Sequence, residues 1–243
     1  MWKNIGLEQC LSYINSQSRL GTAGDRSEVP IRPVITISRL TGSGGHTIAS
    51  RLAEYLQAYA PGHCQWTVFD RELMQKVLED HQLQKSIGDF MPENHKPMLS
   101  DLLEELLGAH PSAWALVEET AETILRLAHL GNVILVGRGA SVVTRKLVNA
   151  FHVRLVGELE NRVGRIQQLH HFDHRQALEF IHREDKGRRR YLKEYYDRDI
   201  DDPVLYDLMI NTDRVQYEEA TRLIGDAVIH RFHLDRPVNV GAA

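Results

Sequence analysis

Apolar residues along the chain form two kinds of pattern, short continuous runs and stripes with a helical period. Runs of Val, Ile, Leu and Phe that are typical of strands buried on both faces fall at residues 34–37, 66–69, 132–136, 151–156 and 206–212. Amphipathic stripes predict helices at residues 47–59, 71–78, 114–130, 158–169, 174–196 and 217–232. Because strands and helices alternate, we predict an α/β domain of three layers with a five-stranded parallel sheet.

The remaining segments lack this regular alternation. Residues 4–17 carry an apolar stripe and precede a linker, so we expect an N-terminal helix and linker over 1–30 and the main domain over 31–243. This helix either packs on the domain or, through its flexible tether, binds a partner in a homodimer or with another protein. Residues 81–111 contain three prolines and two glycines around a short predicted helix at 99–107, which indicates an irregular insertion between the second and third strands.

Composition and charge narrow the class of protein. A chain of 243 residues suits one large α/β domain with insertions, and two small domains are the less simple alternative. Its net charge of -4 gives no overall attraction to nucleic acid or to an acidic membrane, and no apolar run approaches the roughly 20 residues that span a bilayer. The N-terminal segment lacks the features of a secretory signal, so we expect a cytoplasmic protein in which Cys10 and Cys64 are free thiols.

A glycine-rich turn joins the first strand to the first helix of the domain. Its residues are Gly42, Ser43, Gly44, Gly45, His46 and Thr47. Glycines let the backbone approach a ligand closely, and the N–H groups at the start of a helix face an anion. A strand, a glycine turn and a helix in succession therefore predict a phosphate-binding loop, with a turn that binds nothing as the alternative.

This turn departs from the P-loop pattern G-x-x-x-x-G-K-[ST]. When Gly44 is aligned with the last glycine of the pattern, Gly45 stands at the position of the phosphate-binding lysine. His46 then stands at the hydroxyl position and Arg39 at the first glycine, so the cation of the loop is missing. Candidates to replace it are Arg39 itself or an arginine from elsewhere, together with the hydroxyl groups of Ser38, Ser43 and Thr47.

Polar side chains follow other predicted strands at their carboxyl ends, where ligands bind in open α/β sheets. Asp70 and Arg71 follow the second strand, and Arg138 lies between two glycines after the third. The planar guanidinium group of Arg138 suits bidentate binding of a phosphate, with a structural salt bridge as the alternative. Asp70 can face the site and also cap the next helix, because the two roles do not exclude each other.

The predicted helix at 174–196 carries a run of basic residues, which are Arg183, Lys186, Arg188, Arg189, Arg190 and Lys193. Most side chains of such a run are normally solvated. Together with nearby tyrosines the run is also typical of a nucleic-acid-binding surface, but the net negative charge and the phosphate-binding loop count against that interpretation. The histidines around residue 172 do not show the spacing of a zinc site, so we expect no metal ion bound by the protein alone.

Several segments together resemble the cytidylate kinase-like family. They read ISRLTGSGGHTIASRLAEYL, FDRELM, VILVGRGA and YDLMINT, and they extend from residue 34 to the last helix. Members of this family typically show ISR, GSGG and IA in place of a lysine-bearing loop, so the resemblance includes the departure from the P-loop pattern. The family's D-K-x-R-x-x-Y segment is similar to the stretch with Asp185, Lys186, Arg188 and Tyr191.

The resemblance implies a P-loop NTPase-type fold and a nucleoside monophosphate kinase. Such an enzyme transfers the γ-phosphoryl group of ATP, which carries Mg²⁺, to a nucleoside monophosphate, and the family favours CMP or dCMP. The insertion at 81–111 would then close over the acceptor, and residues 173–200 would form a basic lid. A nucleotide-binding or regulatory module that has lost transfer activity, and a kinase for another small acceptor, are the alternatives.

The resemblance also implies a role for each candidate residue. The donor nucleotide would be held by Arg39, Gly42, Ser43, Gly44, Gly45, His46, Thr47 and Asn211, the last at the adenine or ribose. The acceptor would be held by Asp70, Arg71 and Arg138. Catalysis would depend on Arg183 and Arg188 as lid arginines, with Asp185 orienting one of them or an acceptor hydroxyl.

Two further pairs of residues carry alternative interpretations. Arg162 and Arg165 lie three residues apart on a predicted helix, where relatives turn arginines toward the nucleotide, although such residues are more often solvated. Asn211 and Thr212 fall at the carboxyl end of the last strand, where they could contact the adenine or ribose of the donor, and capping of the final helix by Thr212 or Asp213 explains them nearly as well.

Overall fold

The computed structural model describes residues 12–13, 32–60, 65–79, 106 and 114–235. Its sheet has five strands, β1 (Val34–Arg39), β2 (Thr67–Phe69), β3 (Val133–Val136), β4 (Ala150–Val156) and β5 (Leu208–Asn211). The strands lie in the order β2-β3-β1-β4-β5, and every neighbouring pair is parallel. The α/β class and the five-stranded parallel sheet predicted from the sequence are confirmed.

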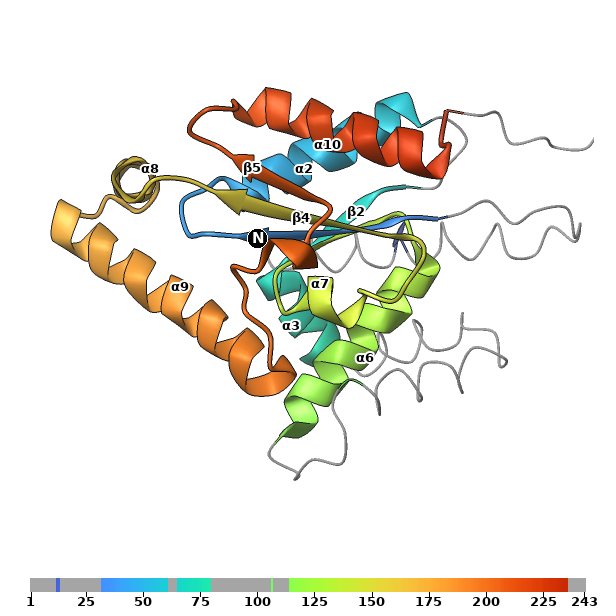
Figure 1. Ribbon diagram of the computed structural model, residues 1–243, viewed down its shortest axis with the longest axis horizontal. Helices are drawn as coiled ribbons and strands as arrows, with labels where there is room; N and C mark the ends of the chain where they lie inside the picture. Colours follow the sequence, from blue (N-terminus) through green and yellow to red (C-terminus); the bar gives the residue numbers. More distant parts are fainter. Residues whose placement is uncertain (1–11, 14–31, 61–64, 80–105, 107–113, 236–243) are drawn as a thin grey trace, which may run out of the picture.

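Helices cover both faces of the sheet and complete the three layers (Figure 1). On one face lie α2 (Gly45–Tyr59) and α10 (Tyr217–Phe232), and on the other lie α3 (Arg71–Glu79), α6 (Ala115–Leu130) and the short α7 (Ala140–Val143). Alternate residues of β1 point to opposite layers: Ile35 and Ile37 pack with the core under α2 and α10, whereas Val34 packs with the core of α6. Both faces are buried, which explains why the strands read as continuous apolar runs.

Two more helices follow β4 at the carboxyl edge of the sheet. They are α8 (Leu159–His170) and α9 (His174–Tyr196), and they pack on each other through a small apolar cluster. A capping box starts α9, in which Asp173 accepts from the N–H of Gln176 and the Gln176 side chain accepts from the N–H of Asp173. The far end of α9 reaches the core below the sheet, because Leu192 and Tyr196 are buried there. This long helix therefore spans the edge where the strands end (Figure 1).

The bounds of most elements agree with the prediction to within two residues. The last strand is shorter than the predicted 206–212, because Tyr206 ends a 3₁₀ turn at Pro203–Leu205 instead. The predicted helices at 4–17 and 99–107, the linker and the insertion lie outside the described residues, apart from residues 12, 13 and 106. None of the helices in the described part of the chain combines the length and apolar character that crossing a membrane requires.

Candidate active site

The glycine-rich turn places the start of α2 at the carboxyl end of β1. Gly42 and Gly44 have φ angles of 81° and 79°, a left-handed backbone conformation that residues with a side chain rarely adopt. Helix α2 begins at Gly45, and no side chain among the described residues caps it, nor does its first turn contain an acidic residue. Its first N–H groups are therefore available for an anion.

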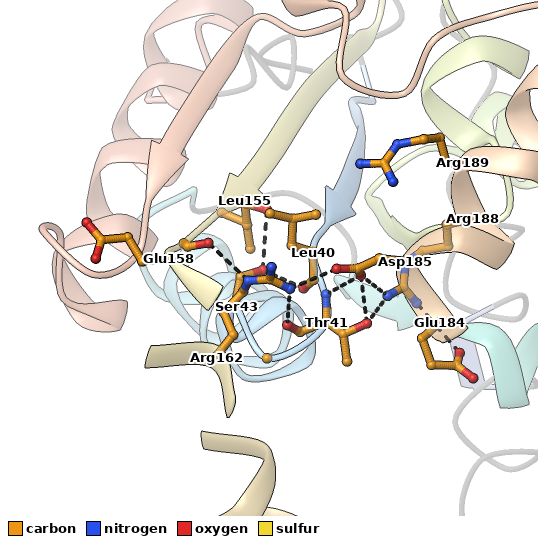
Figure 2. A network of polar contacts seen from close by, with 12 residues as sticks. Leu40, Thr41, Ser43, Leu155, Glu158, Arg162, Glu184, Asp185, Arg188 and Arg189 are labelled. Carbon is orange, nitrogen blue, oxygen red and sulfur yellow. Dashed lines mark hydrogen bonds and ion pairs between the residues drawn. The ribbon is translucent and has the colours of Figure 1, made fainter. Parts of the chain in front are cut away.

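Asp185 of α9 bonds directly to this turn. Its carboxylate accepts hydrogen bonds from the main-chain N–H and the hydroxyl of Thr41, each at 2.8 Å (Figure 2). The same carboxylate accepts from Arg162 Nη1 and Arg188 Nη2, each at 2.7 Å. Burial raises the pKa of Asp185, but the hydrogen bonds from Thr41 and Arg188 outweigh it and leave the pKa below its usual value. The carboxylate is thus held ionised against the turn.

Arg162 and Arg165 of α8 hold the turn from the other side. Arg162 is buried and donates through Nη1 to the carbonyl oxygen of Thr41 at 3.1 Å, besides its bond to Asp185. Arg165 Nη1 donates to the carbonyl oxygen of Gly42 at 3.2 Å, and its Nη2 pairs with Asp213 at 2.5 Å. The interpretation of these arginines as a solvated face is wrong, because each one is bonded to a loop carbonyl and to a carboxylate.

A cavity of about 370 Å³ lies beside the turn, between the ends of β1 and β3 and the middle of α9. Four arginines and one carboxylate line it: Arg39, Arg138, Arg183, Arg188 and Glu184. Arg188 is held by Asp185, whereas Arg183 is 69% exposed and lies over the Phe180 ring at 5.2 Å. Both sequence-predicted lid arginines therefore reach the cavity, and four of the five charged residues that line it are cationic.

The Gly137-Arg138-Gly139 turn forms the wall of this cavity after β3. All three residues have positive φ angles, of 85°, 55° and 71°. For a residue with a side chain such as Arg138 this conformation costs on the order of 1–3 kcal/mol, and such strain often marks a functional site. A Cβ atom at Gly139 would come within 2.8 Å of the Tyr196 ring, so α9 packs closely against the turn. The turn presents the Arg138 side chain at the cavity.

The ends of β2 and β5 carry the other predicted site residues. Asp70 caps α3, since its Oδ1 accepts from the N–H groups of Glu72 and Leu73, and its Oδ2 lies 3.5 Å from Nδ1 of His46. Asp70 therefore caps α3 and also lies beside the glycine turn. Asn211 Oδ1 accepts from the N–H of its neighbour Asp213 at 3.0 Å. The side chain of Arg71 is not among those described.

The interpretation of Thr212 or Asp213 as a cap of the final helix is wrong. Helix α10 begins at Tyr217 after the N-cap residue Gln216, and no side chain of the described residues caps it. Asp213 instead accepts from the N–H of Glu158 at 2.5 Å, at the start of α8, and pairs with Arg165. It thereby connects β5 to the helix that holds the glycine turn.

Sequence reasoning missed Arg154 of β4, which is 1% exposed. Its Nη1 donates to Ser38 Oγ at 2.8 Å and its Nη2 to Asp201 Oδ1 at 2.7 Å. Asp201 also accepts from Arg189 of α9, at 3.1 Å and 2.8 Å. Because Ser38 lines the cavity, this network ties the cavity floor to α9. A charged residue inside an apolar strand was the available signal.

Comparison with known proteins identifies the family. A profile described as the cytidylate kinase-like family matches residues 34–214, which contain the glycine turn, Arg138 and α9. The chain belongs to this family. It is 30% identical to a cytidylate kinase of Methanocaldococcus jannaschii over 80% of this chain and 97% of that protein, and 25% identical to a cytidylate kinase of Thermoplasma acidophilum over 80% and 91%.

A solved structure supports the fold of this cytidylate kinase-like protein. It is the crystal structure of an uncharacterized protein from Eubacterium ventriosum, with a TM-score of 0.63 and 22% sequence identity. The match covers 82% of this chain and 99% of that one, so almost the whole of the other protein shares the architecture. Residues 1–33 lie outside the family match.

Proposed function

We propose that this protein is a nucleoside monophosphate kinase that transfers the γ-phosphoryl group of ATP to a nucleotide, with CMP or dCMP favoured. The observation that carries the proposal is the cavity lined by four arginines beside an uncapped helix start. Phosphoryl transfer needs little covalent chemistry from a protein, and it depends on positioning and on neutralising the charge of the phosphates. The named cytidylate kinases that resemble this chain support the choice of acceptor.

The candidate residues divide into a donor side and an acceptor side. The turn from Gly42 to Thr47 holds the phosphates of ATP with its main-chain N–H groups, and Asn211 lies near the nucleoside part. Asp70, Arg71 and Arg138 hold the acceptor, with the guanidinium group of Arg138 on its phosphate. Arg183 and Arg188 of α9 line the cavity, and Asp185 bonds to Arg188. In the proposed enzyme these two arginines neutralise the transferring group, and Asp185 orients Arg188.

In the reaction an oxygen of the acceptor phosphate forms a bond to the γ-phosphorus of ATP. The bond between that phosphorus and the β,γ-bridging oxygen breaks, and its electron pair leaves with ADP. The acceptor phosphate is already a nucleophile, so no general base has to remove a proton. The arginines neutralise charge that spreads over the phosphoryl oxygens during transfer.

Mg²⁺ fits this site as a companion of the nucleotide. Among the described residues no group of three or more His, Cys, Asp or Glu side chains could hold a metal ion alone. Mg²⁺ is commonly held by phosphate oxygens and water with one or two carboxylates. Asp70 is a carboxylate beside the glycine turn, and Asp185, which also lies there, already accepts from Thr41, Arg162 and Arg188. Bound there, the ion would neutralise part of the negative charge of the phosphates.

The test is to incubate the pure protein with ATP, Mg²⁺ and a panel of nucleoside monophosphates, nucleosides and other small acceptors, and to measure ADP and the phosphorylated product. We expect turnover with CMP or dCMP. Arg138→Ala and Arg188→Ala should each lower kcat/KM at least about 100-fold. Arg190→Ala is the matched control, because Arg190 is 77% exposed and pairs only with Glu194 among the described residues. Equal turnover in all four proteins would contradict the role of the two arginines, and no turnover of wild type with any acceptor of the panel would contradict the kinase itself.

A second candidate is a nucleotide-binding module that has lost transfer activity. The glycine at the position of the P-loop lysine favours it, since a cation at the β- and γ-phosphates contributes strongly to the rate. Binding of ATP without product for any acceptor of the panel would support this candidate over the kinase.

A further inference from the structure

The side chain of Arg39 occupies the space that a lysine at position 45 would need. A Cβ atom at Gly45 would lie 2.9 Å from Cγ and 3.2 Å from Cβ of Arg39, closer than real Cβ atoms normally come. At its other end the guanidinium group of Arg39 lies against Gly137, where a Cβ atom would collide with Nη1. Arg39 therefore runs from the end of β1, across the first residue of α2, to the turn after β3.

The backbone at Gly45 does not itself require glycine. Gly45 begins α2 and is not among the residues with a positive φ angle, in contrast to Gly42 and Gly44 on the same turn. A side chain there would be compatible with a helical backbone. What excludes it is the aliphatic part of Arg39. The lysine of the P-loop pattern and Arg39 therefore exclude each other, because both side chains would need the same space.

The charge of Arg39 is not balanced inside the protein. Burial, followed by the neighbouring charge of Arg188, lowers the pKa of Arg39 to about 10, and Asp70 opposes the shift from a distance. Among the described residues no carboxylate pairs with its guanidinium group, and no oxygen accepts a hydrogen bond from it. A half-buried cation next to other arginines and without an acceptor is costly unless an anion binds there.

We propose that Arg39 takes the place of the missing P-loop lysine and binds the β- and γ-phosphates of the donor nucleotide. The inference rests on the proposed kinase function and assigns one residue its part in it. The cationic side chain then comes from Arg39 at the end of β1, before the glycine turn, and not from the first residues of α2 after it. Its fork reaches Gly137, next to Arg138, so it lies between the donor loop and the acceptor side. Arg39 keeps its proton throughout, and its fork can bind two phosphate oxygens at once.

The experiment moves the cation from one position to the other. Wild type, Arg39→Met, Gly45→Lys and the double variant are compared by calorimetric titration with ATP and Mg²⁺, by kcat with CMP, and by thermal unfolding. Arg39→Met should weaken ATP binding at least tenfold and lower kcat about 100-fold or more, without lowering the melting temperature. Gly45→Lys should also lose activity, because the new side chain displaces Arg39. The double variant should regain at least tenfold in kcat over Arg39→Met, since the ammonium group then has room.

Two further variants keep the result clear. Arg190→Met removes the same charge from an exposed position and should match wild type. Gly45→Ala should weaken ATP binding while the protein stays folded, because its Cβ atom presses on Arg39; it answers the question even if Arg39→Met fails to fold.

The outcomes separate this inference from the kinase proposal. Wild-type turnover combined with unchanged ATP affinity and kcat in Arg39→Met and Gly45→Ala would overturn the role of Arg39 and leave the kinase standing. A double variant no more active than Arg39→Met would overturn the exchange of positions. A wild-type protein that neither binds nor consumes ATP would overturn both.

Discussion

The carboxylate of Asp185 lies against the N–H and the hydroxyl group of Thr41, at 2.8 Å from each. Thr41 directly precedes the glycine turn, and the two arginines that also bind the carboxylate, Arg162 and Arg188, come from α8 and α9 (Figure 2). The carboxylate thus lies where one main-chain N–H group, one hydroxyl group and two guanidinium groups converge, an arrangement that equally suits a phosphate oxygen. Asp185 is at once a structural anion and a competitor for any anion that binds the same donors.

Replacement of Asp185 by Asn should destabilise the free protein and increase its response to anions. The side chains of Asp185 and Arg162 are only 11% and 9% exposed, so loss of the carboxylate leaves a mostly buried guanidinium group without its partner. We expect a loss of about 3 kcal/mol in the free energy of unfolding. Pyrophosphate or ATP should restore more of the stability in Asp185→Asn than it adds to wild type. Chemical denaturation with and without pyrophosphate measures both effects.

Asp197→Asn is the control for this variant. Asp197 pairs with Lys193 of the same helix, but its side chain is 86% exposed, and we expect a change within about 0.5 kcal/mol. An equal response of wild type and Asp185→Asn to pyrophosphate would show that the carboxylate does not compete with anions.

Substitution by alanine should have opposite effects on the free energy of unfolding at Gly42 and at Gly164. Gly42 has a φ angle of 81°, and a Cβ atom there would lie 2.8 Å from the carbonyl oxygen of Arg162. Gly42→Ala should therefore cost about 1–2 kcal/mol and weaken ATP binding. Gly164 lies inside α8 with open space where its Cβ would be, so Gly164→Ala should add roughly 0.5–1 kcal/mol. Urea denaturation of both variants tests the contrast, and a stabilised Gly42→Ala would contradict it.

The fold could be predicted from the sequence because the apolar residues of strands and of helices recur with different periods. Ile35 and Ile37 face one core and Val34 the other, so β1 reads as a continuous run, and α2 shows a stripe because only one side is buried. The register of the strands and the order β2-β3-β1-β4-β5 were not accessible. They depend on contacts between distant segments, such as Val34 beside both Val133 and Ala150.

The candidate site was accessible only in part, for a similar reason. Glycines and an arginine at strand ends are local signals, and they led to the glycine turn and to Arg138. Arg162 looked like an ordinary surface arginine because its partner Asp185 lies 23 positions away on another helix. The relation of Arg39 to Gly45 was also hidden, since a missing lysine in a sequence does not show what fills its space.

Arg154 is buried, whereas its partner Asp201 is 44% exposed, and this ion pair should behave differently when one or both partners are replaced. Asp201→Asn leaves the Arg154 charge buried with Ser38 as an acceptor, but water screens the exposed carboxylate, so we expect a loss of about 1–2 kcal/mol. The double variant Arg154→Met/Asp201→Asn should lose less than Asp201→Asn alone, because the buried charge is removed as well. Urea unfolding of the single and double variants provides the comparison, and a double variant less stable than Asp201→Asn would argue against it.

Stability should also depend on pH through His152, a buried residue of β4. Burial lowers the pKa of His152, the carboxylate of Asp207 opposes the shift, and Arg231 adds to it. The unfolded chain, with a histidine pKa of about 6.5, then binds a proton more readily than the folded protein does. The contribution is therefore fully present above about pH 6.5 and is lost as the pH falls toward the folded-state pKa, with a slope of at most about 1.4 kcal/mol per pH unit.

The comparison of His152→Gln with wild type isolates this term among the 13 histidines of the chain. The hydrogen bond between His152 Nδ1 and Thr36 Oγ1, at 2.8 Å, is lost in the variant, which lowers stability by a similar amount at every pH. Only the difference between the two proteins in the slope of unfolding free energy against pH reports the protonation of His152. We expect the unfolding free energy of wild type to fall more steeply than that of His152→Gln between pH 6.5 and 5, and the two curves to run parallel between pH 7 and 8. His230→Gln, at an exposed position, is the control for removing a histidine. Parallel curves down to pH 5 would show that burial of His152 does not hinder its protonation.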